Sequence, residues 1–496
     1  MKRTGFWAAI ALLAALMFQP GQIWGQDFYV QVNVGNNSNS GVSWGAGNAL
    51  AAIQAAINLA QVTVGSDVIH VAAGTYSENI DVTGDVSIYG GYPPNGGATP
   101  SPAANPTNID GGGSGTVVGI LNVNNVLIDG FAIRNGSVIG RGGGFDIEYC
   151  SSITISNNTI ENNTATDDWG GGIAVVMSSV TITKNIIQNN STNWSGGGIS
   201  FYDRCSGTVS ANTIMGNSAS NGAGMIIEDS NLVVSGNAIK NNTADYEGGA
   251  VYFSDVSSST LTNNIISGNT AETGGGISCV SSSPTIVNCT ITGNTATNAT
   301  GYTGGGILCA YNAFPIIANC ILWADSPDEI YVEGTGATLA VTYSDIQGGY
   351  SGQGNINSDP LFVDSSNGDY HIGSGSPCID TGTSNGAPVT DIEGNMRPYG
   401  TGIDIGAYEN LGLWSGATDL GDGWKYIEWF GYFWVYGNPS WIWHTEHDWV
   451  FTSGTSTSSI SFWTPDIGWF WTSDAYYPWI YSVNNAAWEM WDQNPG

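Results

Sequence analysis

The sequence predicts an all-β solenoid whose successive coils stack as parallel strands. A two-part signature recurs six times: Ile-x-x-Asn, then a loop, then Gly-Gly-Gly-Ile or a close variant. Successive asparagines are 27, 27, 25, 27 and 25 residues apart, and such a period with short apolar runs is typical of solenoids. Apolar and polar residues alternate within each copy, as in 180–183, and no copy has a helical stripe. The asparagines are Asn163, Asn190, Asn217, Asn242, Asn269 and Asn294, and the glycine runs lie at 170–173, 196–199, 222–225, 248–251, 274–277 and 304–307.

Residues 1–25 have the features of a secretory signal peptide. Lys2 and Arg3 precede an apolar run at 6–18, which is too short to span a membrane together with its flanks. We expect cleavage near Gly25–Gln26, which leaves 7 basic and 41 acidic residues and a formal net charge of −34. No second long apolar run follows. We therefore expect a secreted or cell-surface protein with no transmembrane helix in the mature chain.

The formal net charge of −32 for the whole chain restricts its partners. Nucleic acid and anionic lipid surfaces are bound mainly by Lys and Arg, so this charge argues against both. A surface this acidic suits divalent cations. We expect no nucleic-acid partner and no cofactor, unless the chain binds calcium.

Residues 26–65 predict a cap over the first coil. Residues 27–34 form a strand pattern, and Leu50, Ile53 and Ile57 then share one face of an expected helix with Asn48 as its N-cap. The end of a solenoid exposes unpaired backbone groups unless another element covers it. We expect this helix to be that lid.

Coils are expected from residue 66 to residue 330, with Ile, Val and Leu pointing inward. Each signature asparagine should turn inward at a bend, where its amide can bind the backbone and the asparagines of the neighbouring coils. The glycines permit the tight bend and positive φ before the next strand. A phosphate-binding role for the glycine runs is disfavoured, because no helix follows them.

The chain has seven cysteines, and four of them fall at equivalent points of neighbouring coils. Cys279 and Cys309 each follow a glycine run by three residues, and Cys289 and Cys320 share another repeat position. Adjacent strands are about 4.8 Å apart, which is within reach of a disulfide. Each pair is therefore either a disulfide or two buried thiols. Cys150, Cys205 and Cys378 have no evident partner.

Two further segments follow the regular coils. Residues 331–410 hold the last coils and a group of short motifs. Residues 411–496 hold thirteen of the nineteen tryptophans, and two echoes of Gly-Trp followed by Trp-Ile-aromatic indicate a separate small β module. The motifs before it are Ser-Pro-Cys-Ile-Asp-Thr-Gly at 376–382, Asp-Ile-Glu-Gly-Asn-Met-Arg-Pro at 391–398 and Asp-Ile-Gly-Ala-Tyr-Glu at 404–409.

These motifs resemble known families. The repeats are similar to those of polymorphic outer-membrane proteins, which have Phe-x-x-Asn and Gly-Gly-Ala-Ile, although Ile replaces the Phe here. The opening segment and the coils resemble secreted right-handed parallel β-helix proteins of the pectate-lyase-like superfamily. The motifs of 376–409 resemble the choice-of-anchor Q segment, which closes many bacterial surface β-helix proteins. Together the resemblances cover roughly residues 27–409 and imply a right-handed parallel β-helix at the cell surface.

The superfamily resemblance raises an enzymatic alternative, because its members cleave polysaccharides by elimination or hydrolysis. Elimination needs a base beside a cation, and hydrolysis needs grouped carboxylates. Asp203, Asp229 and Asp255 follow successive bends, with Arg204 beside the first and Glu228 beside the second. One interpretation is a carboxylate cluster with Arg204 as base or substrate clamp and a cation at Asp203, Glu228 and Asp229. The other is a set of solvated turn residues, since Asp favours turns.

The few basic residues limit a lyase further. Arg134 aligns one coil below Glu161, so we expect a surface salt bridge between them rather than a catalytic role. His444 and His447 in the tail are only weak evidence for a metal site.

A second candidate site lies in the loops between the two halves of the signature. Aromatic side chains there could stack against sugar rings while acidic neighbours accept the sugar hydroxyls. The alternative is that the aromatics pack on one another and cover loop backbone. The aromatic residues are Trp169, Trp194, Tyr246 and Tyr302, and the acidic ones are Asp167, Asp168, Asp245, Glu247 and Glu272.

Two functions follow from the sequence. The first is a non-catalytic cell-surface or matrix protein that acts in adhesion or glycan binding, with a polysaccharide or cell-envelope glycan as partner. The second is a polysaccharide lyase or glycoside hydrolase that uses Asp203, Asp229 and Arg204 and carries a carbohydrate-binding tail. The scarcity of basic residues and the lack of a compact acid cluster favour the first. The tail either presents its tryptophans as a binding surface or buries them as a core.

Overall fold

A computed structural model describes residues 25–62, 65–298, 301, 303–334, 336–412, 414, 417–435, 441–456, 459–465 and 467–491. The expected signal peptide and Tyr302 lie outside the described residues. The chain forms two compact units, one ending at Asn357 and one beginning at Ser358, and each is described by itself.

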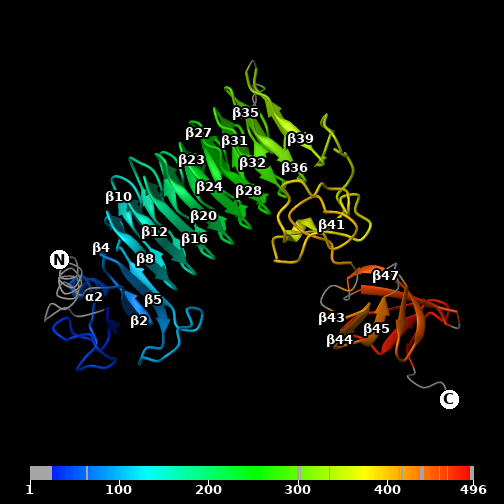
Figure 1. The fold of residues 1–496 in the computed structure, drawn as a ribbon, viewed down its shortest axis with the longest axis horizontal. Helices are drawn as coiled ribbons and strands as arrows, with labels where there is room; N and C mark the ends of the chain where they lie inside the picture. Colours follow the sequence, from blue (N-terminus) through cyan, green and yellow to red (C-terminus); the bar gives the residue numbers. More distant parts are fainter. Residues whose placement is uncertain are drawn as a thin grey trace, which may run out of the picture. The chain divides into compact units, whose positions relative to one another are not determined.

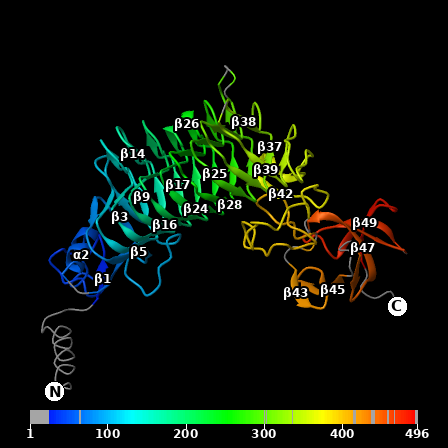
Figure 2. The ribbon, with the colours of Figure 1, turned by 45° about the horizontal axis from the view of Figure 1, so that its top comes forward.

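The first unit is a parallel β-solenoid, as predicted (Figure 1). Its coils contribute strands in turn to three long sheets, and the second view shows these strands stacked along one axis (Figure 2). A shorter fourth sheet runs beside the loops that precede the glycine runs. Coil strands continue past residue 330, to Ile346.

The strands of each sheet have the following bounds. The twelve-stranded sheet contains β1 Asp27–Val30, β2 Asp67–Ala72, β5 Val86–Tyr92, β8 Asn124–Asp129, β12 Ser151–Ser156, β16 Ser179–Thr183, β20 Ser206–Ser210, β24 Asn231–Ser235, β28 Thr260–Thr262, β32 Thr285–Val287, β36 Ile316–Ala318 and β39 Ala340–Thr342. The eleven-stranded sheet contains β3 Gly74–Tyr76, β6 Thr107–Asp110, β9 Ala132–Arg134, β13 Thr159–Glu161, β17 Ile186–Gln188, β21 Thr213–Met215, β25 Ala238–Lys240, β29 Ile265–Ser267, β33 Thr290–Thr292, β37 Ile321–Trp323 and β40 Asp345–Ile346. The ten-stranded sheet contains β4 Ile80–Val82, β7 Val118–Leu121, β11 Phe145–Glu148, β15 Ile173–Val176, β19 Ile199–Tyr202, β23 Met225–Glu228, β27 Val251–Ser254, β31 Ile277–Val280, β35 Ile307–Ala310 and β38 Ile330–Val332. The seven-stranded sheet contains β10 Ser137–Val138, β14 Thr164–Ala165, β18 Ser191–Thr192, β22 Ser218–Asn221, β26 Thr243–Glu247, β30 Thr270–Ala271 and β34 Thr295–Ala296.

Equivalent apolar residues meet across neighbouring coils and form the core of the solenoid. Ile153 pairs with Val180, and Ile160 pairs with Ile187, each in register and fully buried. Parallel pairing with a fixed register places every inward residue over its counterpart, so one buried row runs the length of each sheet. The period-2 pattern therefore specifies the core.

The signature asparagines form the predicted ladder. Asn190 donates from Nδ2 to the Ile160 carbonyl at 2.9 Å and to Oδ1 of Asn217 at 3.1 Å, and its own Oδ1 accepts hydrogen bonds from Asn163. The same pattern repeats from coil to coil, so each buried amide is satisfied. The ladder is structural, as expected.

A second ladder runs parallel to the first. It is formed by the Asn of each Asn-x-Ile tripeptide, such as Asn185, whose Nδ2 donates to the Ile155 carbonyl and to Oδ1 of Asn212. Cys289 and Cys320 end this ladder, because they occupy the same position in later coils. Sequence analysis recognised this position but not its hydrogen bonding.

The helical lid is present, but its predicted cap is wrong. Helix α2 spans Ile53–Ala60, begins after Ala52 and buries Ile53 and Ile57. Asn48 lies four residues upstream, in a turn, so its side chain does not cap the helix. The carboxylate of Glu78, from the segment before β4, instead accepts the N–H groups of Ile53 and Gln54 at 2.8 and 3.1 Å. An acidic side chain from another coil thus satisfies the helix N-terminus.

The paired cysteines are buried thiols in this structure. Cys279 and Cys309 lie in register on β31 and β35, and Cys289 and Cys320 follow one another in the second ladder. The alignment of both pairs agrees with the repeat spacing. Of the two alternatives left open by the sequence, the structure has the reduced one.

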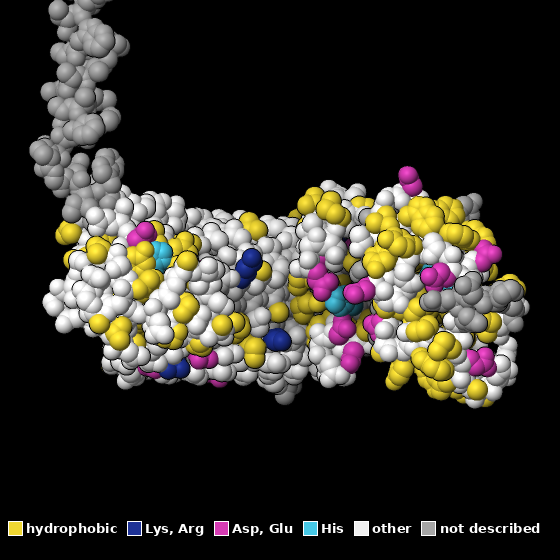
Figure 3. Space-filling model, turned by 90° about the horizontal axis from the view of Figure 1, so that it is seen from below, with side chains coloured by type: hydrophobic (Ala, Val, Ile, Leu, Met, Phe, Trp, Pro, Cys, Tyr) yellow, Lys and Arg dark blue, Asp and Glu magenta, His cyan; other side chains and the backbone are white. Residues whose placement is uncertain are grey.

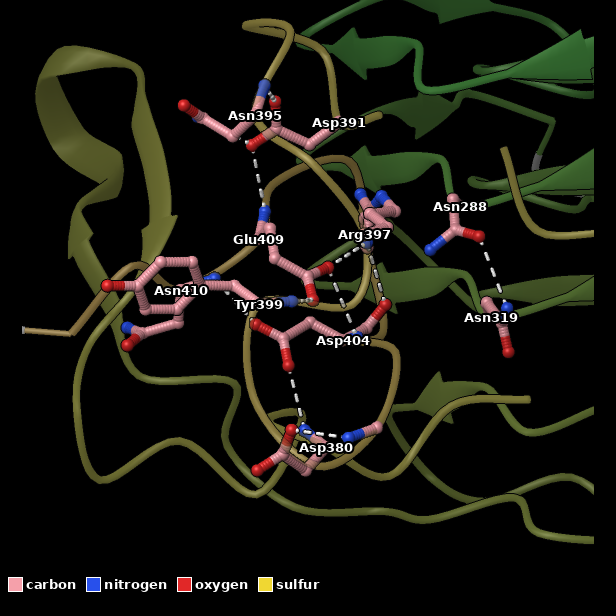
Figure 4. Close-up of polar contacts among 12 residues, drawn as sticks. Asn288, Asn319, Asp380, Asp391, Asn395, Arg397, Tyr399, Asp404, Glu409 and Asn410 are labelled. Atoms are coloured by element: carbon pink, nitrogen blue, oxygen red, sulfur yellow. Dashed lines mark hydrogen bonds and ion pairs between the residues drawn. The ribbon is translucent and has the colours of Figure 1, made fainter. Parts of the chain in front are cut away.

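The second unit begins with a short hairpin and a long ordered loop region. Strands β41 Phe362–Asp364 and β42 Asp369–Ile372 flank the 3-10 helix η1 Ser365–Asn367. Arg397 is the central side chain of the loops that follow, and it binds Glu409 at 2.7 Å and the carbonyls of Asp404 and Gly406 (Figure 4). The motifs at 391–398 and 404–409 therefore serve to hold these loops together.

The second unit ends in a nine-stranded antiparallel meander. Its strands are β43 Thr418–Gly421, β44 Trp424–Ile427, β45 Gly431–Val435, β46 Trp441–His444, β47 Asp448–Ser456, β48 Ser459–Thr464, β49 Gly468–Thr472, β50 Trp479–Ser482 and β51 Ala487–Met490. The small tryptophan-rich β module predicted from the sequence is confirmed.

Candidate functional site

Most of the residues singled out from the sequence lie in the loops and turns that border the ten-stranded sheet, and Glu228 stands on the outer face of the sheet itself. Two rows of side chains in register point outward on this sheet. One row is Glu148, Val176, Tyr202, Glu228 and Ser254, and the other is Asp146, Ala174, Ser200, Ile226, Tyr252, Ser278 and Leu308. Several of these are buried although they point away from the core, because neighbouring loops cover them. The face is therefore partly covered by loops, and its aromatic and acidic side chains remain partly exposed.

The predicted aromatic loop residues fall into different environments. The Trp169 ring stacks on Tyr202 with ring centres 4.0 Å apart and planes 19° apart. Trp194 is exposed in a bend before the next glycine run, and Tyr246 is exposed on strand β26. Trp169 thus packs on an aromatic side chain of the sheet face and not on another of the loop aromatics, whereas Tyr246 remains open to solvent.

The acidic loop residues are likewise divided. Asp167 and Asp245 are exposed, while Asp168 accepts the N–H of Trp169 at 3.0 Å. Glu247 accepts the hydroxyl of Ser278 at 2.8 Å, and Glu272 accepts the side-chain amide of Asn298 at 3.2 Å. Glu247 and Glu272 both line one cavity.

Asp203, Asp229 and Asp255 occupy the turns after β19, β23 and β27. All three have positive φ, of 59°, 40° and 49°, as turn residues do. Arg204 binds its neighbour Asp203 at 2.9 Å and is largely exposed. This geometry agrees with the interpretation of the three aspartates as turn residues. Arg204 is paired with one of these turn residues and not with a buried group of carboxylates.

Glu228 differs from these turn residues because it stands on the sheet face. It lies in register between Tyr202 and Ser254. Burial, followed by the charge of Asp255, raises the pKa of Glu228. The charges of the turn carboxylates therefore influence this sheet face from one side, and Trp169 contacts the same face from the loops on the other side. The two candidate sites predicted separately thus border one surface.

A further acidic pair on this face was missed by sequence analysis. Asp146 and Glu148 alternate on β11, so both point outward, and Arg141 binds Glu148. Burial, followed by the Glu148 carboxylate, raises the pKa of Asp146 to about 7. The pattern Asp-x-Glu on a strand could have indicated this pair, because residues i and i+2 share a face.

Arg134 does not bind Glu161 as expected. Both Asp110 and Glu161 pair with Arg134 in register, one coil below and one coil above. Arg134 binds Asp110 at 3.1 Å, while Glu161 accepts the side-chain amide of Gln188 at 2.8 Å. Asp110 also accepts Asn135, which holds it toward Arg134. Arg134 has one acid in register on each side, and the hydrogen bonds that Asp110 and Glu161 make to other side chains decide that it binds Asp110.

A cavity of about 300 Å³ opens on the same sheet face farther along the solenoid. It lies over β35 and the loops that lead into neighbouring coils. Its lining residues are Tyr246, Glu247, Glu272, Thr273, Asn298, Leu308, Ala310, Tyr311 and Glu333. Tyr311, Leu308, Ala310 and Glu333 were not predicted, because their nearness to Tyr246 depends on the stacking of two coils.

No metal centre emerges from the residues that the structure describes. Among them, no three His, Cys, Asp or Glu side chains are grouped as metal ligands would be. Asp203, Glu228 and Asp229 therefore do not converge as a calcium site. In the tail, His447 stacks on Trp491 with ring centres 3.6 Å apart, and burial, with the nearby His444, lowers its pKa to about 3. Both histidines are uncharged parts of the module's packing.

The tryptophan-rich module separates its aromatic residues by face. Its buried cluster contains Phe433, Ile442, Val450, Phe462 and Phe470. Strand alternation places the neighbours of these residues on the opposite face. Ten of the thirteen tryptophans lie there: Trp424, Trp434, Trp441, Trp443, Trp449, Trp463, Trp469, Trp471, Trp479 and Trp488. We call this surface the tryptophan face.

The tryptophans of this face are aligned across the strands. Trp424, Trp434, Trp443 and Trp449 form one row in register, and Trp441, Phe451, Trp463 and Trp469 form a second. Their rings pack edge to face, as for Trp424 and Trp443, whose ring centres are 5.8 Å apart and whose planes meet at 90°. Hydrophobic side chains crowd the surface of this module, with carboxylates between them (Figure 3). Most tryptophans of the tail thus lie outside the core of the module, while Trp414 and Trp491 belong to that core.

Comparison with known proteins agrees with the fold. The sequence profile described as "Right handed beta helix region" matches residues 107–244 and 171–347. Three solved structures are similar in chain path, all at low identity. The pectate lyase Pel9A has 14% identity and a TM-score of 0.45, covering 78% of this chain and 97% of that one. XylC in complex with xylose has 11% identity and a TM-score of 0.37, covering 77% of this chain and 98% of that one. The pectin methylesterase from Aspergillus niger has 15% identity and a TM-score of 0.27, covering 69% of this chain and 88% of that one.

Two further findings concern relatives and membrane-spanning helices. No curated protein matches this sequence. Among the described residues, no helix is both long and apolar enough to cross a membrane.

Proposed function

We propose that this right-handed parallel β-helix protein is exported and binds an extended glycan without cleaving it, through the tryptophan face of its second unit. The observation that carries the proposal is the alignment of Trp424, Trp434, Trp443 and Trp449 on the surface opposite a complete core. The core already holds Phe, Ile and Val together with Trp414 and Trp491, so the tryptophans outside it call for another role.

The chemistry of this face suits sugar rings. Flat indole rings offer large apolar surfaces to the C–H faces of sugars and lose little side-chain entropy on binding. Nearby polar groups can accept hydroxyl protons. Asp448, for example, lies at the rim and accepts the indole N–H of Trp443 at 2.8 Å. Because the edge-to-face packing already fixes the rings, the surface is rigid before the ligand arrives.

The charge of the module favours a glycan over an anionic membrane surface as its partner. Lys425 is the one basic side chain among the described residues of the nine strands, which contain Asp448 and Glu489 as well. Binding to anionic lipid depends on clusters of Lys and Arg. A neutral polysaccharide has no such requirement.

Catalysis has less support than binding. Asp146 and Glu148 share one face of β11, and the Glu148 carboxylate is bound by Arg141. Arg204, the expected lyase base, is exposed and paired with its neighbour Asp203. Enzymatic cleavage by Asp203, Asp229 and Arg204 therefore remains the second candidate.

The test is binding of the full mature chain to insoluble glycans, with cleavage read in the same tubes. Trp449→Ala should weaken binding about tenfold, since stacking contacts are typically worth more than 1 kcal/mol. Phe314→Ala is the matched control, because Phe314 is an aromatic residue of similar exposure on the solenoid (49% against 43%). Equal binding by both variants, or release of reducing or unsaturated sugar ends, would count against the proposal.

A further inference from the structure

The cavity over β35 combines three carboxylates with two exposed aromatic rings. Glu247, Glu272 and Glu333 line it, and Tyr246 and Tyr311 stand at its rim with 57% and 60% of their surfaces exposed. Leu308 and Ala310 of β35 provide an apolar part of the wall. Its volume of about 300 Å³ is near the lower end of the range for small-molecule sites.

No basic side chain lines this cavity. Glu247 is held by the Ser278 hydroxyl at 2.8 Å and Glu272 by the Asn298 amide, so both carboxylates are hydrogen-bonded but not neutralised. Burial raises the pKa of Glu247, and the charge of Glu333 raises it further. The wall thus has an excess of negative charge that the protein itself does not balance.

The shape of the acidic wall favours an organic cation over a metal ion. The three carboxylates are not grouped as metal ligands. A carboxylate beside an aromatic ring is the usual environment for an ammonium group, which gains from both charge and cation–π attraction. A uronate sugar, in contrast, would add a like charge to the wall and be repelled.

We propose that this cavity binds an ammonium-bearing sugar, such as an unacetylated glucosamine unit of the bound glycan. The inference rests on the proposed glycan-binding function and names a sugar class for a second site on the solenoid. The ammonium group lies between Glu247 and Glu333, with the sugar ring against Tyr246 or Tyr311. No covalent step is involved.

The proposal predicts how binding depends on pH. Glu247 must be ionised to attract the ammonium group, and its pKa is raised. The contribution of Glu247 to the affinity should therefore be lost as the pH falls through the pKa of its carboxyl group. Glu272 and Glu333 line the same cavity, and Tyr252, whose own pKa is raised by burial and by the charge of Glu247, lies near Glu247. None of these groups is positively charged, so the ligand supplies the only cation.

The test uses two β-1,4 hexasaccharides that differ in N-acetylation, and hence in charge, hexaglucosamine and hexa-N-acetylglucosamine, with the full mature protein in calorimetry. We expect binding of the amine form, at least tenfold weaker binding of the acetylated form, and loss of this preference in Glu333→Gln. Glu161→Gln is the control, because it removes one carboxylate from a different sheet. Its preference should match that of the wild type.

The outcomes separate this inference from the proposed function. Equal affinity for the two hexamers, or an unchanged preference in Glu333→Gln, overturns the amine site. Loss of the preference in Glu333→Gln with retained binding to insoluble glycan supports it, because the tryptophan face then still acts. Failure of Trp449→Ala to affect insoluble-glycan binding, with the amine preference intact, would instead overturn only the role of the tryptophan face.

Discussion

Asp325 accepts two hydrogen bonds from Asn294, from the backbone N–H at 2.7 Å and from Nδ2 at 2.8 Å. In the preceding coils an asparagine makes this contact. The Oδ2 atom of Asp325 takes the place of the asparagine Nδ2, since it lies beside Gly306 as Nδ2 of Asn294 lies beside Gly276. An acceptor thus stands where the ladder otherwise has a donor.

Glu329 adjoins this last rung. Both carboxylates are buried, and burial raises the pKa of Asp325 to about 6 and, together with the hydrogen bond to Asp325, that of Glu329 to about 10. Two buried carboxyls that share a site hold a proton between them. The ladder therefore ends in two buried acids whose pKa values are both raised.

We predict that Asp325→Asn stabilises the solenoid at neutral pH by on the order of 1 to 2 kcal/mol, because it completes the ladder and removes a buried acid. Urea unfolding at pH 7.5 and pH 4.5 measures the effect. Asp328→Asn is the control and should destabilise, because the Asp328 carboxylate already accepts Gly304 and Thr303. An unchanged stability of Asp325→Asn at pH 7.5 would contradict the assignment.

The same pair fixes the direction of the pH dependence. Both carboxyls have folded-state pKa values above their unfolded values, so their contribution to stability is complete below about pH 4. As the pH rises, the unfolded chain releases protons that the folded chain retains, and stability falls until the pH passes the folded pKa of Glu329. We expect Glu329→Gln to flatten this decline in a series of unfolding measurements between pH 4 and 9. A slope equal to that of the wild type would argue against it.

Removal of one rung should destabilise the solenoid strongly. Asn217→Ala loses the hydrogen bonds to the Ile187 carbonyl and to Asn242, and leaves groups of Asn190 without an acceptor. Unsatisfied buried polar groups cost about 1 to 3 kcal/mol each, so we expect a loss of about 2 to 5 kcal/mol. The exposed Asn193→Ala should change little. Urea unfolding followed by circular dichroism distinguishes the two.

Arg397 should be essential to the second unit, in contrast to Arg204. Its side chain is fully buried against Glu409, and loss of one partner of a buried pair costs about 3 to 5 kcal/mol. Arg397→Met is therefore expected to unfold the loops around residues 391–409, which limited proteolysis would detect. Arg204→Met should leave the protease pattern unchanged. Resistance of the Arg397 variant to proteolysis would show that the loops are held in another way.

The coil contents were predictable because every repeat faces the same environment. An asparagine at a fixed period has the same neighbours in each coil, so a single bend explains all six, as Asn190 and Asn217 illustrate. The site was less accessible. Tyr202 comes to lie against Trp169, and Tyr311 and Tyr246 come to line one cavity, only when successive coils stack, and no local pattern encodes that approach.

The sequence by itself determined the parallel solenoid, its asparagine ladder and the separate tryptophan-rich module, because periodic burial of one face leaves a periodic trace in the chain. Tertiary structure decided the choices between nearly equivalent partners. Arg134 has an acid on each side and binds Asp110, helix α2 receives its cap from Glu78, and the tryptophans lie on the open face of their sheet. These choices depend on which groups the rest of the fold has already hydrogen-bonded or buried, which the repeat pattern does not record.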